Sequence, residues 1–277
     1  MKPNDAILIP EWPAPPNIRA LVTTRLLPGQ SKPPFDRFNL GTRCGDEPAA
    51  VMANRALLEE ALGLPEAPRW IQQVHGNDVH DADAVLADAE PKADAAVTRN
   101  AGRVLAVLTA DCLPVFICAD DGSAVGIAHA GWRGLAGGVI EATVASLAVP
   151  PSSLIAWLGP SIGQRSYEVG DEVRTAFLQS DAAAAEAFEP TRPGHWLCNL
   201  SALARQRLAA AGVERISGGD FDTFSDARFY SYRRERETGR FASLIWLTPA
   251  TVKTPEREQA DTGEDSAPTQ SVFAFSR

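Results

Sequence analysis

The sequence is poor in the residues that build metal and redox sites. Its 277 residues include only four histidines and four cysteines, and no two cysteines form a CxxC pair. We therefore expect free thiols in a cytoplasmic protein rather than a disulfide framework. Basic residues are also outnumbered, with 26 Lys and Arg against 35 Asp and Glu and a net charge of −9. This deficit argues against a nucleic-acid partner, because neutralising phosphates requires clustered positive charge.

Long apolar runs are missing as well. The sequence has no run of the roughly 18 apolar residues that a membrane-spanning helix needs, so we expect no membrane partner. The N-terminal stretch, residues 1–16, is rich in proline and has no long apolar segment, which argues against a signal peptide.

The composition that is present supports a sizeable core, since 45% of the residues are hydrophobic. We expect one catalytic domain over residues 1–253 and a polar, mostly disordered tail over residues 254–277. Stretches with strand and helix patterns mix without a regular β-α-β-α alternation. The expected fold class is therefore α+β, with mixed β-sheets flanked by helices.

A β-hairpin is predicted at the centre of the chain. Residues 104–109, 114–119 and 124–128 are apolar runs typical of buried strands. Asp121-Gly122 lies between the last two runs and favours a type I′ turn, which requires positive φ.

This turn fixes a register with a chemical consequence. With Asp121 and Gly122 as the loop, residue i pairs with residue 243 − i, so His129 faces Pro114. Cys112 lies two positions from Pro114, on the same face, and is a diagonal neighbour of His129. The open end of the hairpin is thus predicted to bring a thiol and an imidazole together.

A third candidate ligand follows from position. His75, like His129, comes after an apolar run that is expected to be a strand (69–74) and precedes a glycine. His75, Cys112 and His129 form a donor set that suits zinc, and three protein ligands leave one coordination position open for catalysis.

Two alternatives remain at this point. The two histidines are also explained as polar residues at strand ends, with Cys112 as a small buried hydrophobe. Alternatively, Cys112 is a nucleophile whose pKa His129 lowers, and Asp111 orients the neighbouring groups.

Two basic segments suit anions or planar rings. Trp132-Arg133-Gly134 precedes a helix expected over residues 135–147, and Arg133 with that helix start would hold a phosphate or carboxylate. Arg233-Arg234, near Tyr230 and Tyr232, offers a second basic and aromatic patch. Each segment is equally well explained as a solvated surface.

Five stretches of the sequence form a set of motifs: QQVHG (72–76), TADCLPV (109–115), HAGWRG (129–134), GPSIG with SYEVG (159–170) and FYSYRRERETGRFASLIWL (229–247). Together, over about residues 18–250, they resemble one bacterial family. That family is described as multicopper polyphenol oxidoreductase (laccase-like), as purine nucleoside phosphorylase and as peptidoglycan editing factor. One departure is Asp222, near a position where many relatives carry a cysteine.

The resemblance implies a single-domain fold of mixed sheets layered between helices, of an α-β-β-α, cysteine-hydrolase-like type. It implies that His75, Cys112 and His129 bind a metal, zinc or alternatively copper. The implied activity is phosphorolysis of adenosine, inosine, guanosine and methylthioadenosine, together with adenosine deamination. Its partners would be a purine nucleoside and phosphate, and the protein would be a monomer or small homo-oligomer.

Cys112, Asp111 and Arg133 are the expected catalytic residues. Arg133 would hold phosphate, and Asp111 would act as a base or as a partner of a metal ligand. The alternative functions are an amide hydrolase that edits peptidoglycan precursors and a copper-dependent polyphenol oxidase. A multicopper centre conflicts with four histidines in all, because Cu(II) prefers nitrogen ligands.

Overall fold

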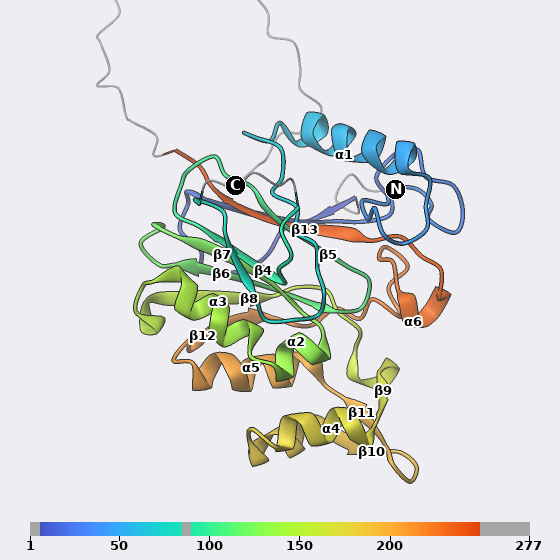
Figure 1. The fold of residues 1–277 in the computed structure, drawn as a ribbon, viewed down its shortest axis with the longest axis vertical. Helices are drawn as coiled ribbons and strands as arrows, with labels where there is room; N and C mark the ends of the chain where they lie inside the picture. The colour runs from blue at the N-terminus through green and yellow to red at the C-terminus, as the bar shows by residue number, and fades with distance from the viewer. Residues whose placement is uncertain (1–5, 85–89, 250–277) are drawn as a thin grey trace, which may run out of the picture.

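Two β-sheets stacked between helices form the body of the protein, in a computed structural model that describes residues 6–84 and 90–249 (Figure 1). The first sheet has four strands in the order β1 (Ile7–Leu8), β2 (Ile18–Thr23), β13 (Phe241–Leu247) and β5 (Leu105–Thr109). The second has six, in the order β12 (Arg215–Gly218), β8 (Leu154–Leu158), β6 (Leu113–Ala119), β7 (Val125–Ala130), β4 (Ala95–Thr98) and β3 (Val79–Asp81). The six-stranded sheet is mixed, because β12–β8 and β3–β4 are parallel pairs.

Helices cover the outer face of each sheet. Helix α1 (Pro48–Leu62) lies over the four-stranded sheet, and α3 (Val139–Leu147) and α5 (Leu200–Ala210) lie on the far side of the six-stranded sheet (Figure 1). The short helices are α2 (Trp132–Ala136), α6 (Tyr232–Glu235) and the 3₁₀ turns Pro151–Ser153, Gln164–Ser166 and Ala182–Ala187. A small sheet of β10 (Phe188–Pro190), β11 (His195–Cys198) and β9 (Glu168–Gly170) packs with α4 (Asp171–Leu178) at one end. This layering confirms the expected mixed fold.

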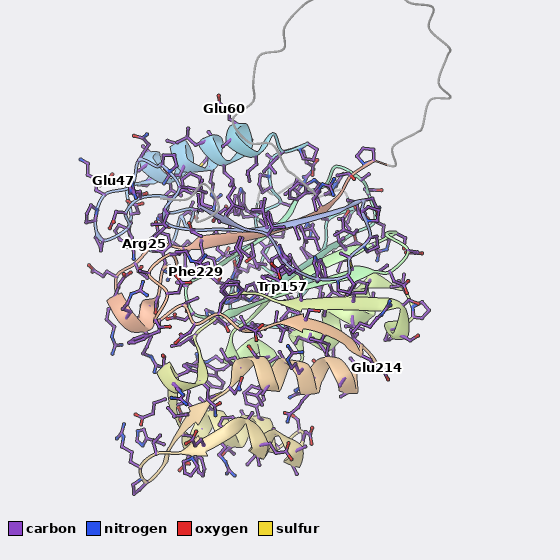
Figure 2. The ribbon with its side chains drawn as sticks, turned by 180° about the vertical axis from the view of Figure 1, so that it is seen from behind. Arg25, Glu47, Glu60, Trp157, Glu214 and Phe229 are labelled. Carbon is purple, nitrogen blue, oxygen red and sulfur yellow. The ribbon has the colours of Figure 1, made fainter. Side chains whose placement is uncertain are left out.

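Strand alternation places the core. In β6, Val115 and Ile117 face the helix side, whereas Phe116 and Cys118 point into the space between the two sheets. Phe116 contacts Trp157 edge to face there, with ring centroids 5.2 Å apart. Seen from behind, Trp157 and Phe229 lie in this space (Figure 2). Because successive side chains of a strand alternate, one strand supplies two core layers.

The predicted hairpin is confirmed in its register. Pro114 pairs with His129 and Cys118 with Val125. The expected type I′ turn was wrong, because it needs positive φ at both central residues, and only Gly122, with a φ of 73°, has it. Residues 120–123 form the loop instead, closed by a hydrogen bond from the Ala119 N–H to the Ala124 carbonyl. The hairpin is β6–β7, at the centre of the six-stranded sheet, so the site residues at its open end rest on a fully buried frame.

Two local expectations were wrong. Residues 69–74 make only isolated bridges, Arg69 to Leu105 and Gln72 to Lys92, because their partners lie on two different segments and no continuous ladder forms. The single helix expected over 135–147 is instead α2 followed by α3. Gly138 separates them with a φ of 90°, a conformation that favours glycine. Because α2 begins at Trp132, Arg133 lies inside the helix rather than before it.

Among the described residues, no helix has the length and apolar character to cross a bilayer.

Candidate metal centre and its cavity

The three predicted ligands meet at one point. The donor atoms of His75, Cys112 and His129 all lie within 4.8 Å of one another. The Cys112 sulfur is 4.0 Å from Nε2 of His75, and the two imidazole rings are 4.8 Å apart at their centroids, nearly perpendicular. The geometric prediction drawn from the hairpin is thus confirmed, and His75 completes the cluster.

The three candidate ligands lie on three different segments of the chain. His129 is at the end of β7 and only 3% exposed, whereas His75 is exposed and has a positive φ of 61°. Cys112 lies on the short connection from β5 to β6, where the chain passes from the four-stranded to the six-stranded sheet. The cluster therefore sits at one edge of the sandwich, between its two sheets.

Gly131 leaves room for an ion among these donors. A Cβ atom at this position would lie 3.0 Å from the Cys112 sulfur, 3.1 Å from Cδ2 of His75 and 3.6 Å from Nε2 of His129. Two imidazoles and a thiolate are ligands that zinc prefers, and copper binds the same donors. The residues present therefore fit a transition-metal ion.

Asp94 contacts two of the three candidate ligands, and the sequence reasoning missed it. Its carboxylate is fully buried, lies 2.8 Å from Nδ1 of His129 and accepts hydrogen bonds from the backbone N–H groups of Val74, His75 and Gly76 at 2.7–3.1 Å. Burial would raise the pKa of Asp94, but these contacts outweigh it and lower the pKa. An acidic residue directly before the fully buried run Ala95–Thr98 was the available signal.

The charges of Cys112 and His129 stabilise each other. Burial would raise the pKa of Cys112, but the neighbouring His129 and His75 outweigh burial, and the pKa of Cys112 is lowered. Burial would lower the pKa of His129, but Cys112 and Asp94 outweigh burial, and the pKa of His129 is raised. The cluster thus favours a thiolate, which is the form that binds metals and attacks electrophiles.

A cavity of about 520 Å³ opens beside the cluster. Its walls come from residues far apart in the sequence, including the loop at residues 41–44, Gln73, the segment 108–112, Trp132, Tyr167 and Tyr232. The volume is in the range of small-molecule sites. Five arginines line it, Arg43, Arg55, Arg133, Arg233 and Arg240, against two described carboxylates, Glu90 and Asp111.

The two other predicted catalytic residues both line this cavity. Asp111 is 8% exposed; its carboxylate accepts hydrogen bonds from the Thr223 hydroxyl and the Arg233 backbone N–H, each at 2.7 Å. Arg133 is exposed, and its guanidinium lies 4.4 Å from the ring centroid of Trp132. Within the described part of the chain Arg133 pairs with no carboxylate, so its charge is available to a ligand.

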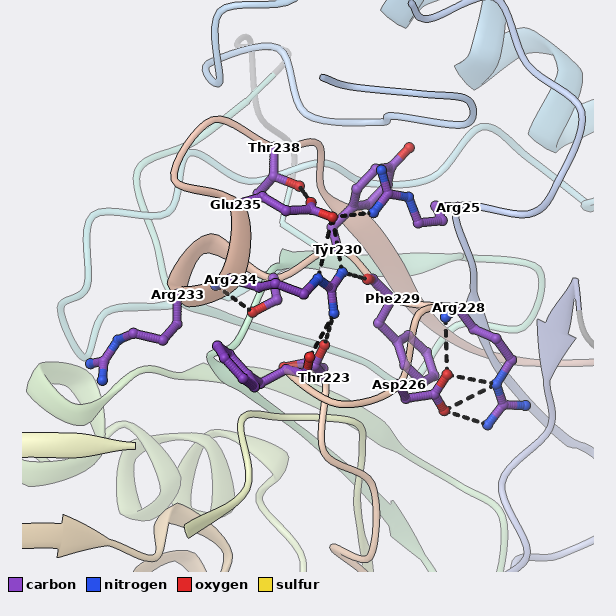
Figure 3. A network of polar contacts seen from close by, with 12 residues as sticks. Arg25, Thr223, Asp226, Arg228, Phe229, Tyr230, Arg233, Arg234, Glu235 and Thr238 are labelled. Carbon is purple, nitrogen blue, oxygen red and sulfur yellow. Dashed lines mark hydrogen bonds and ion pairs between the residues drawn. The ribbon is translucent and has the colours of Figure 1, made fainter. Parts of the chain in front are cut away.

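The predicted patch at Arg233-Arg234 divides into two parts. Arg234 is used internally, since it donates to the carbonyls of Thr223, Phe224 and Phe229 and contacts Glu235 (Figure 3). Figure 3 shows Arg233 pointing away from this network. Its guanidinium lies 5.1 Å from the ring of Tyr167 and lines the cavity.

The departure at Asp222 has a structural explanation. Its carboxylate accepts hydrogen bonds from the N–H groups of Gly163 and Phe224 and from the Ser166 hydroxyl, at 2.8–3.0 Å. Asp222 therefore fixes the loop that leads to Tyr167, and it does not line the cavity. Cys44 does line the cavity.

Comparison with known families identifies the group to which these residues belong. Residues 19–248 match the family model described as multi-copper polyphenol oxidoreductase laccase. The chain belongs to this family.

Relatives within the laccase family carry a different name. The chain is 53% identical over 251 residues to a protein of Xylella fastidiosa named purine nucleoside phosphorylase, which covers 87% of this chain and 96% of the relative. It is 48% identical over 246 residues to purine nucleoside phosphorylase YfiH of Escherichia coli, with coverage of 87% and 98%.

A solved structure of a relative has the same fold. The crystal structure of a Neisseria meningitidis protein superposes with a TM-score of 0.84 at 44% identity, and the match covers 88% of this chain and all of the other. The family assignment and the layered fold thus agree.

Proposed function

We propose that the protein is a metal-dependent purine nucleoside phosphorylase that also deaminates adenosine. Two findings support the activity: relatives of about half identity carry that name, and the cavity joins a metal-type cluster to unpaired positive charge. The observation that carries the proposal is the convergence of His75, Cys112 and His129 beside Arg133. Adenosine, inosine, guanosine and methylthioadenosine are the proposed substrates.

In the proposed phosphorolysis, the metal ion and the side chains of the cavity have different roles. In phosphorolysis, a phosphate oxygen bonds to C1′ of the ribose and the bond from C1′ to the purine nitrogen breaks. The purine leaves with the proton that the hydrogen phosphate gives up. Arg133 binds the phosphate through charge-assisted hydrogen bonds. When bound, zinc, or alternatively copper, supplies a Lewis acid that stabilises developing negative charge. Trp132 and Tyr232 offer aromatic faces to the planar base.

Asp111 and Asp94 position neighbouring groups and do not react themselves. Both oxygens of Asp111 accept hydrogen bonds, from Thr223 and from Arg233. Of the two roles expected for Asp111, this favours positioning over proton transfer. Asp94 takes the role of orienting His129, which the nucleophile hypothesis had given to Asp111.

A specific observation favours a second candidate, a thiol-dependent amide hydrolase. Cys112, His129 and Asp94 are arranged as nucleophile, base and orienting carboxylate, with Nδ1 of His129 2.8 Å from Asp94. In that reaction Cys112 would attack an amide carbonyl of a peptidoglycan precursor and form a thioester, while the C–N bond breaks and the amine leaves with a proton from His129. Water would then hydrolyse the thioester to a carboxylic acid and the free thiol.

One experiment tests the first proposal. Incubation of the purified protein with inosine should release hypoxanthine and ribose 1-phosphate only when phosphate is present. Cys112→Ala should lose both bound metal and turnover. Cys198→Ala, which removes a buried thiol outside the cavity, should keep both.

The alternatives have distinct outcomes. Base release that does not depend on phosphate would refute phosphorolysis. Cleavage of a muramyl-peptide amide by metal-free protein, with no release of base, would favour the hydrolase.

A further inference from the structure

Three arginines that line the cavity gather around one loop, and in the described residues none of them makes a hydrogen bond or ion pair with His75, Cys112 or His129. Arg43 and Arg55 both pair with Glu90, at 3.1 Å and 2.9 Å. Arg240 lines the same cavity and donates from its guanidinium to the carbonyls of Thr238 and Gly239. In a chain with a net charge of −9, this local excess does not follow from the overall composition.

The loop at residues 40–43 brings these arginines together. Arg55 donates from Nε to the Leu40 carbonyl at 3.1 Å. The stem of Arg240 crosses Gly41 so closely that a Cβ there would be 2.8 Å from its Cγ. Arg43 follows two residues later on the same loop.

Contacts within the protein hold Arg55 and the loop at residues 40–43 in place. Arg55 is 6% exposed, and its guanidinium is held 4.1 Å from the ring centroid of Trp70. The buried Asn39 amide accepts from the backbone N–H of Arg240 and donates to Asp46, which fixes the loop. A guanidinium held by stacking and a carbonyl presents its remaining donors in a fixed direction, which suits a tetrahedral oxyanion.

Residues 90–94 connect the arginines to the metal-type cluster, since Glu90 contacts Arg43 and Arg55, and Asp94 contacts His75 and His129. The Cα atoms of Glu90 and Asp94 are at most about 14 Å apart. Both groups line one cavity, so one small molecule can contact both.

We propose that Arg43, Arg55 and Arg240 form a subsite for a phosphate-type oxyanion. The anion is either a phosphate group carried by the substrate, as in a nucleoside 5′-monophosphate, or free inorganic phosphate. The inference rests on the proposed function only in taking this cavity as the substrate site.

Binding measurements separate the two sources. Calorimetric titrations at constant ionic strength would compare adenosine, adenosine 5′-monophosphate and inorganic phosphate on the metal-loaded protein. Arg43→Gln is the test variant, because Arg43 is exposed and its described pairing is with Glu90 alone. Arg215→Gln is the matched control: Arg215 also pairs with one carboxylate, Asp120, but lies on β12 outside the cavity.

Two results would support the subsite. In the first, the monophosphate binds more tightly than adenosine, and Arg43→Gln reduces this advantage about 10-fold or more, the effect of one charge-assisted hydrogen bond. In the second, inorganic phosphate shows the same dependence and the monophosphate has no advantage. Arg215→Gln should leave both affinities unchanged, and both variants should melt like the wild type.

Anion binding that is equal in wild type and Arg43→Gln, or absent from both, would overturn the subsite. That result leaves phosphorolysis of inosine untouched. Conversely, Arg43-dependent binding in a protein that releases no base would overturn the proposed reaction and retain the subsite.

Discussion

Replacing Asp94 with asparagine should weaken metal binding while the fold survives. The carboxylate oxygens contact Nδ1 of His129 and three backbone N–H groups, of Val74, His75 and Gly76. An asparagine oxygen in place of Oδ1 can keep the contacts to His129 and His75. Its NH₂ group would then face the N–H groups of Val74 and Gly76, donor against donor.

The magnitude follows from these contacts. Two backbone N–H groups lose their acceptor, at about 1–3 kcal/mol for each that stays shielded from water. Loss of the negative charge behind His129 reduces the basicity of its ligating nitrogen, and partners of this kind are typically worth about 10- to 100-fold in metal affinity. That range corresponds to about 1.4–2.7 kcal/mol.

The assay is a competition titration with a chromophoric zinc chelator, alongside a thermal melt. Asp222→Asn is the matched control, since Asp222 also accepts two backbone N–H groups but lies outside the cavity. We expect both variants to lose stability and only Asp94→Asn to lose zinc affinity. Equal zinc affinity in the wild type and both variants would refute the orienting role of Asp94.

Three further predictions concern thiol reactivity, acid stability and the core. Burial raises the pKa of both Cys118 and Cys198 to about 12. Iodoacetamide at about pH 8 should therefore modify Cys112 in metal-depleted protein and spare these two thiols, and zinc should protect Cys112. Peptide mass spectrometry would measure the modification of each cysteine. Burial would raise the pKa of Asp222, but its hydrogen bonds outweigh burial and lower the pKa below its value in the unfolded chain. The contribution of Asp222 to stability is therefore present above about pH 4 and lost as the pH falls. Asp222→Asn should flatten the acid-denaturation curve in that range. Phe116→Ala removes a fully buried ring between the sheets and should cost about 3–5 kcal/mol in denaturant unfolding; a loss under about 1 kcal/mol would contradict this packing.

The central hairpin and its chemistry were predictable because they are local. Asp121-Gly122 marks the centre of the turn, the position of the turn determines the register, and the register places Cys112 beside His129. The prediction that Cys112 and His129 are neighbours used only the sequence of residues 112–129. The placement of His75 came from a weaker pattern, a histidine after an apolar run, although that run makes only isolated bridges rather than a strand.

The parts that were missed depend on contacts across the fold. Asp94 is 19 residues from His75 and 35 from His129, and no spacing rule connects them. The subsite arginines are brought together by the loop at residues 40–43, whose position depends on Asn39 and on Arg240 some 201 residues away. Pairings at such separations are set by the packing of whole layers, which one sequence does not reveal.

The domain limits and the tail remain predictions. Residues 6–84 and 90–249 lie within the expected domain of residues 1–253, whereas the expected tail at residues 254–277 lies outside the described residues.

The passage of the chain from β5 to β6 has a mechanical consequence. Cys112 belongs to this crossing, His129 ends a strand of the six-stranded sheet, and His75 is anchored through Asp94. An ion held by all three would cross-link these three segments at one edge of the sandwich. By mass action, a free ion at 100 times its dissociation constant would add about 2.7 kcal/mol to unfolding. Removing the ion with a chelator should therefore destabilise this edge first. Amide hydrogen exchange should become faster near residue 112 before it does so at the opposite edge of the sandwich.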